Sequence, residues 1–159
     1  MAIQVGDQLP DTGLTVMQDG KPAGLSRDEL FAGKKVVLFA VPGAFTPTCS
    51  MAHLPGFVVK ADEIQAKGVD SIICLSVNDA FVMDAWGKEK NAEALIMAAD
   101  GNGDFTQAIG LEMDASGFGM GVRSQRYAMV IDDGVVSALH IEAPGKLEVS
   151  SAEAVLSNL

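Results

Sequence analysis

The sequence contains few cysteines, few basic residues and no long hydrophobic run, and each scarcity excludes a class of protein. Its 159 residues include two cysteines, Cys49 and Cys74, which are too few for a disulfide framework, and no Cys-X-X-Cys pair of the kind disulfide reductases use. Eleven basic residues against 21 acidic ones give a formal charge of -10, which disfavours nucleic acid and anionic membrane surfaces as partners. The longest apolar run, 36–41, is far too short to span a bilayer.

The N-terminus lacks the basic segment and apolar stretch of a secretory signal peptide. We therefore expect a cytoplasmic protein, in which a reducing environment leaves at least one thiol free. A chain of this length with 48% hydrophobic residues can bury one core but not two comfortable ones. A single domain over residues 1–159 is the expectation.

Strand and helix patterns alternate along the chain in the order of a mixed α/β sheet. Asp19-Gly20 and Asp132-Asp133-Gly134 each indicate a β-hairpin, with strands over 14–17 and 22–25 and over 127–131 and 135–141. Two β-branched apolar stretches, 35–41 and 69–76, are typical of buried central strands. A strand, helix, strand, helix order followed by a hairpin and a closing helix predicts a thioredoxin-like fold, with helices flanking the sheet.

The helices are predicted from caps and stops. One begins near Pro47 and runs to about Lys67, with a kink or break at Pro55-Gly56. The other predicted elements are a short helix capped by Ser26, a helix over 79–90, a short strand over 95–98, a short helix over 105–109 and a last helix capped by Ser150 or Ser151.

Cys49 lies where a helix should begin, after a central strand has brought the chain to the edge of the sheet. Proline is favoured at the first helical position, so Pro47 puts Thr46 at the N-cap and Cys49 at the third position of the first turn. Free N–H groups of a first helical turn favour a thiolate over a thiol. The sequence therefore predicts a reactive nucleophile at Cys49.

The string from Pro42 to Ser50, PGAFTPTCS, resembles the active-site signature of the peroxiredoxins. Together with His53-Leu54-Pro55-Gly56 it is similar to the peroxiredoxin-five class, which includes the plant type-II enzymes. Residues 74–82, Trp86-Gly87 and Arg126-Tyr127 also match that class, so the resemblance spans nearly the whole chain.

The resemblance implies a role for each of four residues. Cys49 attacks a peroxide oxygen and becomes a sulfenic acid. Thr46 binds the peroxide through its hydroxyl, and Pro42 shields the pocket from water. Arg126 stabilises the thiolate and the charge that grows on the breaking O–O bond. In the family the arginine directly precedes a strand that begins with an aromatic residue, which favours Arg126 over Arg123. Arg123 is expected to be a solvated loop arginine or to contact the residues that bind the substrate rather than the substrate itself.

The resemblance also implies hydrogen peroxide and small alkyl hydroperoxides as substrates and a homodimer. We expect no metal or cofactor. Some class members carry a resolving cysteine before the last helix, but residues 147–151 here contain none. We therefore expect a one-cysteine mechanism in which glutathione, often with a glutaredoxin, reduces the sulfenic acid. The alternative is a non-enzymatic peroxide sensor or redox-regulated binding module that uses the same cysteine.

Four other residues have plainer interpretations. Cys74 lies in a buried strand and is expected to be a core thiol. His53, one helical turn after Cys49, is expected to pack or to contact a partner subunit, with a general base as the lesser alternative. His140 is expected at the surface, and Met120 is a candidate for lining the pocket.

Overall fold

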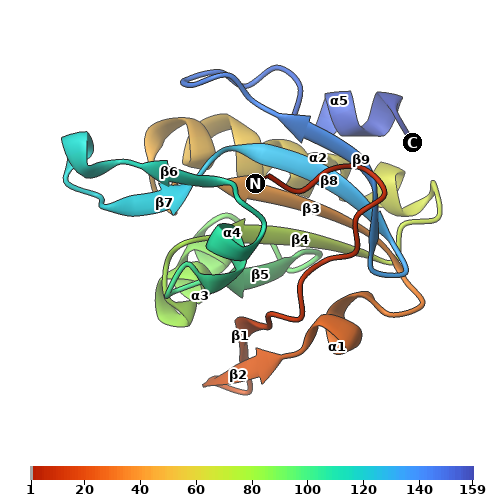
Figure 1. Cartoon of the computed structure of the whole chain (residues 1–159), viewed down its shortest axis with the longest axis horizontal. Helices are drawn as coiled ribbons and strands as arrows, with labels where there is room; N and C mark the ends of the chain where they lie inside the picture. Colours follow the sequence, from red (N-terminus) through yellow and green to blue (C-terminus); the bar gives the residue numbers. More distant parts are fainter. Residues whose placement is uncertain (1) are drawn as a thin grey trace.

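The two predicted central strands lie in the middle of a seven-stranded mixed sheet. In the computed structural model, which describes residues 2–159, β3 (Lys35–Val41) pairs in parallel with β4 (Ser71–Ser76) and antiparallel with β8 (Tyr127–Asp132). The strand order is β2-β1-β5-β4-β3-β8-β9, with helices on both faces (Figure 1). Both faces of β3 are covered, which explains its continuous apolar sequence.

Both predicted hairpins are present, and their turns have the expected backbone geometry. β1 (Leu14–Gln18) and β2 (Lys21–Leu25) are joined by Asp19-Gly20, with φ of 51° and 78°. β8 and β9 (Val135–Ile141) are joined by Asp133-Gly134, with φ of 49° and 80°. Two positive φ angles in succession are the mark of a type I′ turn, whose twist matches the flanking strands.

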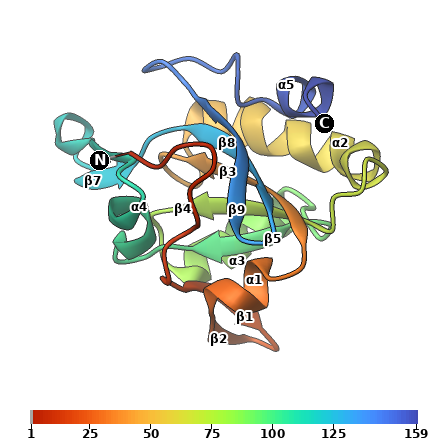
Figure 2. The same ribbon diagram turned by 45° about the vertical axis from the view of Figure 1, so that its right-hand side comes forward.

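Side chains that alternate along the central strands divide the core in two. On one face of the sheet, residues such as Phe39 and Cys74 pack against α2 (Leu54–Gln65), α3 (Ala80–Glu89) and α5 (Ala152–Ser157). On the other face, residues such as Leu38 and Tyr127 pack against α1 (Arg27–Phe31), α4 (Asp104–Ala108) and the N-terminal segment. Helices α2 and α5 lie side by side (Figure 2).

The helix that begins at Pro47 has no break at Pro55-Gly56, so that prediction is wrong. Its irregularity lies one turn earlier, as the π-helical segment η1 (Cys49–His53), after which α2 follows directly. The N–H of Leu54 donates to the carbonyl of Cys49, five residues back. Proline has no N–H to donate, so Pro55 is accommodated at the start of α2 by this change of register.

A small second sheet projects from one side of the molecule and was not predicted. β6 (Glu112–Asp114) pairs with β7 (Val122–Ser124), and the short 3-10 helix η2 (Ser116–Phe118) lies between them (Figure 1). The remaining strand, β5 (Ile96–Ala99), lies one residue later than expected. Among residues 2–159, no helix is long and apolar enough to cross a membrane.

Candidate active site

Cys49 lies at the start of a helix, at the end of the loop that leaves β3. The N–H of Ser50 donates to the carbonyl of Thr46 at 2.9 Å, which makes Thr46 the N-cap position, as predicted. The loop before it turns at Phe45, whose φ of 64° is rare for a residue with a side chain. The N–H of Ala44 donates to Asn78 Oδ1 at 2.9 Å and anchors the loop to the next strand end. Cys49 itself is fully buried.

Arg126 is the partner of the buried sulfur. Its Nη2 donates to Cys49 Sγ at 3.0 Å. Arg126 directly precedes β8, and β8 pairs with β3 so that Tyr127 lies opposite Ala40. The pairing register therefore carries the arginine to the end of β3, where the cysteine loop begins. A guanidinium stays charged throughout the working pH range and favours an anionic sulfur over a neutral one.

His53 holds the other end of the same guanidinium. Its Nδ1 lies 2.7 Å from Arg126 Nη1, and its Nε2 lies 2.9 Å from the carbonyl oxygen of Ser150. The pKa of His53 is lowered to about 4, mainly by burial and also by the Arg126 charge, while the hydrogen bond to the Ser150 carbonyl and the Glu142 charge oppose the shift. The ring is therefore neutral, with its proton on Nε2 and its Nδ1 accepting from Arg126. A nitrogen committed to Arg126 cannot serve as a base for the Cys49 thiol.

Thr46 and Pro42 line a cavity of about 730 Å³ that opens beside the cysteine. Arg126 and Met120 also line it, so the placement expected for Met120 is confirmed. The Thr46 hydroxyl donates to the carbonyl of Gly43 at 2.6 Å. Its hydrogen is thereby committed, and its lone pairs remain able to accept a hydrogen bond from a peroxide O–H group. The other lining residues are Thr48, Glu112, Met113, Ala115, Phe118, Gln125, Glu142, Ala143, Pro144, Gly145 and Lys146.

Gly43 allows Met120 and Thr46 to pack closely in the wall of the cavity. A Cβ at that position would lie 2.9 Å from Met120 Cε and 3.1 Å from Thr46 Cγ2, closer than ordinary contact. Arg123 lies beside the same wall, since its Nη1 would be 3.4 Å from that Cβ, and its Nε donates to the carbonyl of Met120 at 3.0 Å. Arg123 therefore contacts the cavity wall at Met120, whereas Arg126 contacts the sulfur.

Cys74 has the surroundings of a core residue, as predicted. It is fully buried in β4 opposite Phe39, and neither cysteine forms a disulfide. Burial raises the pKa of the Cys74 thiol well above its ordinary value, and the nearby Cys49 raises it further. Cys74 is therefore a protonated, apolar thiol at neutral pH.

Two residues near the site were not predicted correctly from the sequence: His140 was expected elsewhere, and Glu142 was not identified. His140, expected at the surface, is half-buried, and its Nε2 is enclosed without a hydrogen-bond partner. Glu142 is buried in the wall of the first cavity, and its carboxylate accepts several hydrogen bonds from the segment before α5. The only sequence signal for Glu142 is an acidic residue directly after a strand, which is normally read as a surface position.

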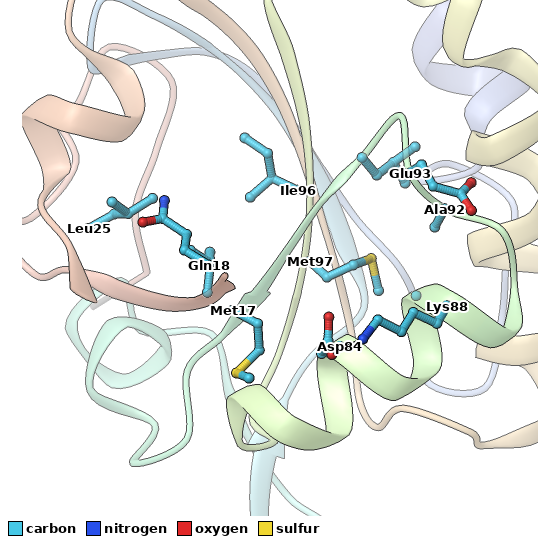
Figure 3. Close-up of a pocket in the computed structure, with 12 residues that line it drawn as sticks. Met17, Gln18, Leu25, Asp84, Lys88, Ala92, Glu93, Ile96 and Met97 are labelled. Atoms are coloured by element: carbon cyan, nitrogen blue, oxygen red, sulfur yellow. Dashed lines mark ion pairs between the residues drawn. The ribbon is translucent and has the colours of Figure 1, made fainter. Parts of the chain in front are cut away.

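A second cavity of about 410 Å³ lies between β1, α3 and β5 (Figure 3). Its walls are mainly apolar, with Met17, Leu25 and Met97 among them. The ion pair of Asp84 and Lys88, 2.9 Å apart, lies at one side. Its lining includes neither Thr46 nor Arg126, whereas both line the first cavity, and Arg126 bonds to Cys49 Sγ, so the first cavity is the candidate active site.

Comparisons with known proteins agree with this geometry. The Redoxin family profile matches residues 4–156. Peroxiredoxin-2E-2, chloroplastic, of Oryza sativa subsp. japonica is 54% identical, over 99% of this chain and 72% of its own length. Peroxiredoxin-2B of Arabidopsis thaliana is 49% identical, over 99% and 98% of the two chains. The crystal structure of reduced Prx3 from Vibrio vulnificus in complex with H2O2 superposes with a TM-score of 0.95, at 59% identity and 98% coverage of each chain. This chain belongs to the Redoxin family and, within it, to the peroxiredoxins, which are thiol peroxidases.

Proposed function

We propose that this peroxiredoxin works with one cysteine, reducing hydrogen peroxide and small alkyl hydroperoxides and relying on an external thiol for its own recovery. The Cys49 thiolate forms a bond to one peroxide oxygen as the O–O bond breaks, and water or an alcohol leaves after taking a proton. Cys49 is then a sulfenic acid. One glutathione condenses with it and releases water, and a second glutathione, or a glutaredoxin, displaces the mixed disulfide and restores the thiol.

The hydrogen bond from Arg126 Nη2 to Cys49 Sγ is the observation that carries this proposal. It places a permanent charge where negative charge develops on sulfur and oxygen in the transition state, and a fixed donor of this kind lowers the barrier by about 3 kcal/mol. Thr46 lines the same cavity, and its hydroxyl, which donates to Gly43, is left to act as an acceptor. These three groups supply a nucleophile, a charge and an orienting acceptor.

Recovery by an outside thiol is supported by the surroundings of Cys74. The chain has no other cysteine, and this one is enclosed in the core with a raised pKa. A protonated, inaccessible thiol attacks a sulfenic acid poorly, because the thiolate is the nucleophile. Cys49, in contrast, is bonded to Arg126, which lines the cavity together with Thr46, and the cavity's volume of about 730 Å³ offers room for a thiol as well as a peroxide.

Exposed apolar side chains beside the cavity support a homodimer. Phe45, in the active-site loop, and Phe118, in the connection of β6 and β7, are 47% and 86% exposed. Large exposed aromatic side chains are typical of protein–protein contacts. Sedimentation velocity of the wild type and of Phe118→Ser tests the homodimer. The wild type should sediment as a dimer, and a wild-type monomer would contradict the proposal.

The mechanism is tested by intact-mass analysis after one equivalent of peroxide followed by glutathione. We expect one glutathione adduct, on Cys49, which persists in Cys74→Ser and is absent from Cys49→Ser. A Cys49–Cys74 disulfide would refute the one-cysteine mechanism. Steady-state turnover with glutathione and glutaredoxin separates an enzyme from the alternative, a non-enzymatic sensor, which would be oxidised once and would not turn over.

A further inference from the structure

Glu142 clamps the segment that leads from β9 into α5. Its Oε2 accepts hydrogen bonds from the N–H groups of Glu148, Val149 and Ser150 at 2.8, 2.9 and 2.7 Å, and from Ser150 Oγ at 2.7 Å. The residue is 7% exposed. Burial opposes ionisation, but these hydrogen bonds outweigh it and lower the pKa of Glu142, so the group is a carboxylate at neutral pH.

An unbroken chain of hydrogen bonds leads from this clamp to the reactive sulfur. The Ser150 carbonyl accepts from His53 Nε2 at 2.9 Å, and His53 Nδ1 accepts from Arg126 Nη1 at 2.7 Å. Arg126 Nη2 then donates to Cys49 Sγ at 3.0 Å. A main-chain bond closes the circuit, because the N–H of Glu142 donates to the carbonyl of Arg126 at 2.9 Å.

We propose that Glu142 is a positioning residue for the peroxidase reaction, which fixes the Arg126 guanidinium on Cys49 through Ser150 and His53. The proposal rests on the role of Cys49 as the nucleophile. An arginine side chain has many rotamers, so its two donors stay in place only if each acceptor is fixed. His53 is one acceptor, and its orientation depends on the Ser150 carbonyl, which the Glu142 carboxylate holds in position.

Only an ionised carboxylate suits this clamp. Four donors converge on one oxygen, and charge-assisted hydrogen bonds of this kind are about twice as strong as neutral ones. A glutamine would offer one neutral amide oxygen, and its NH2 group would have no acceptor among these donors. The same clamp fixes one wall of the substrate cavity, since residues 142–146 line it.

The test is Glu142→Gln, with Glu148→Gln as the matched control. The control removes the same charge from the same segment, but its carboxylate is 69% exposed and makes only a 3.7 Å contact with Lys146. The measurement is single-turnover oxidation of Cys49 by hydrogen peroxide, which needs no thiol reductant. We expect Glu142→Gln to be roughly tenfold slower than the wild type, below the hundredfold loss that a misplacement of about 1 Å produces. Glu148→Gln should match the wild type.

A second readout separates positioning from a general loss of structure. The rate of Cys49 alkylation by iodoacetamide, followed against pH, should shift to higher pH in Glu142→Gln, because a displaced guanidinium stabilises the thiolate less. His53→Asn breaks the chain at the ring. If Glu142 acts through His53, adding Glu142→Gln to His53→Asn should cause little further loss.

Three results would overturn the proposal: an oxidation rate in Glu142→Gln equal to that of Glu148→Gln, an unchanged alkylation profile, or fully additive losses in the double variant. If Glu142→Gln does not fold, Ser150→Ala takes its place, because it removes one of the four hydrogen bonds and keeps the carbonyl. Ser150→Ala should then shift the alkylation profile of Cys49 to higher pH by a smaller amount, and an unshifted profile would overturn the proposal. Failure of the proposed function is distinguishable, since it appears in the wild type as absent Cys49 oxidation or absent recovery by glutathione.

Discussion

Replacing Arg126 by alanine should slow the reaction of Cys49 with hydrogen peroxide by roughly a hundredfold. The guanidinium donates to Cys49 Sγ at 3.0 Å, and the sulfur is fully buried. Loss of one preorganised donor aimed at transition-state charge costs about 3 kcal/mol, and each ~1.4 kcal/mol is a factor of ten in rate. Arg126→Lys should recover part of the rate, because it keeps the charge but lacks the planar fork whose two nitrogens bond to Cys49 and His53.

Stopped-flow fluorescence measures this rate directly. Trp86 is the only tryptophan, and its indole N–H donates to Ser50 Oγ at 2.8 Å, next to the reacting residue. Arg123→Ala is the control, since it removes an arginine from the same region without removing a bond to sulfur. A rate for Arg126→Ala within about threefold of the wild type, far from the expected ~3 kcal/mol, would refute the assignment of Arg126.

Two further predictions concern pH and packing. Burial lowers the pKa of His53 from 6.5 to about 4, so the unfolded chain takes up this proton first as pH falls. The free energy of unfolding should therefore fall as the pH drops from 6.5 toward 4, by about 2 kcal/mol between about pH 7 and about pH 5. Urea unfolding of His53→Asn should show a smaller fall over the same range. Gly43→Ala should slow Cys49 oxidation roughly tenfold with little change in stability, because its Cβ would push against Thr46 and Met120 in the cavity wall.

Each of these has a control and a contradicting result. For the first, the wild type is the reference, and an equal slope in His53→Asn would show that His53 is not the group responsible. Gly24→Ala should leave the oxidation rate unchanged, because a Cβ there meets nothing within 4 Å. Wild-type kinetics in Gly43→Ala would show that the cavity wall yields freely.

Local chemistry explains which parts of the fold could be predicted. The hairpin turns at Asp19-Gly20 and Asp133-Gly134 depend on residues that tolerate positive φ, and the helix caps at Ser26, Asp79 and Ser151 depend on one or two nearby side chains each. Such features need only a few neighbouring residues. The strands β6 and β7 are three residues each and flank a glycine-rich segment. They are too short to show the alternation of apolar and polar residues by which a strand is predicted.

The site residues also divide into those that the local sequence predicts and those that it does not. Thr46, Pro47 and Cys49 are neighbours in sequence, and their arrangement at a helix start could be predicted from the preference of proline for the first turn. Arg126 is 77 residues from Cys49, and only the family resemblance selected it over Arg123. The effect of Pro55 was placed one turn too late, because proline indicates that the helix register must change but not where the change occurs.

The support behind the site could not be predicted at all. His53, Ser150 and Glu142 come from three separate parts of the chain, and their hydrogen bonds exist only once α2 and α5 pack side by side. A buried glutamate looks like a surface residue in the sequence until its partners are known. The predicted cytoplasmic location is a question that the fold does not address, and it stays a prediction.

The role of Cys49 is tested by locating the sulfenic acid that forms after one equivalent of hydrogen peroxide, trapped with dimedone and identified by peptide mass spectrometry. We expect one adduct per chain, on Cys49, present also in Cys74→Ser and lost in Cys49→Ser together with peroxide consumption. An adduct on Cys74, or undiminished peroxide consumption by Cys49→Ser, would contradict that role.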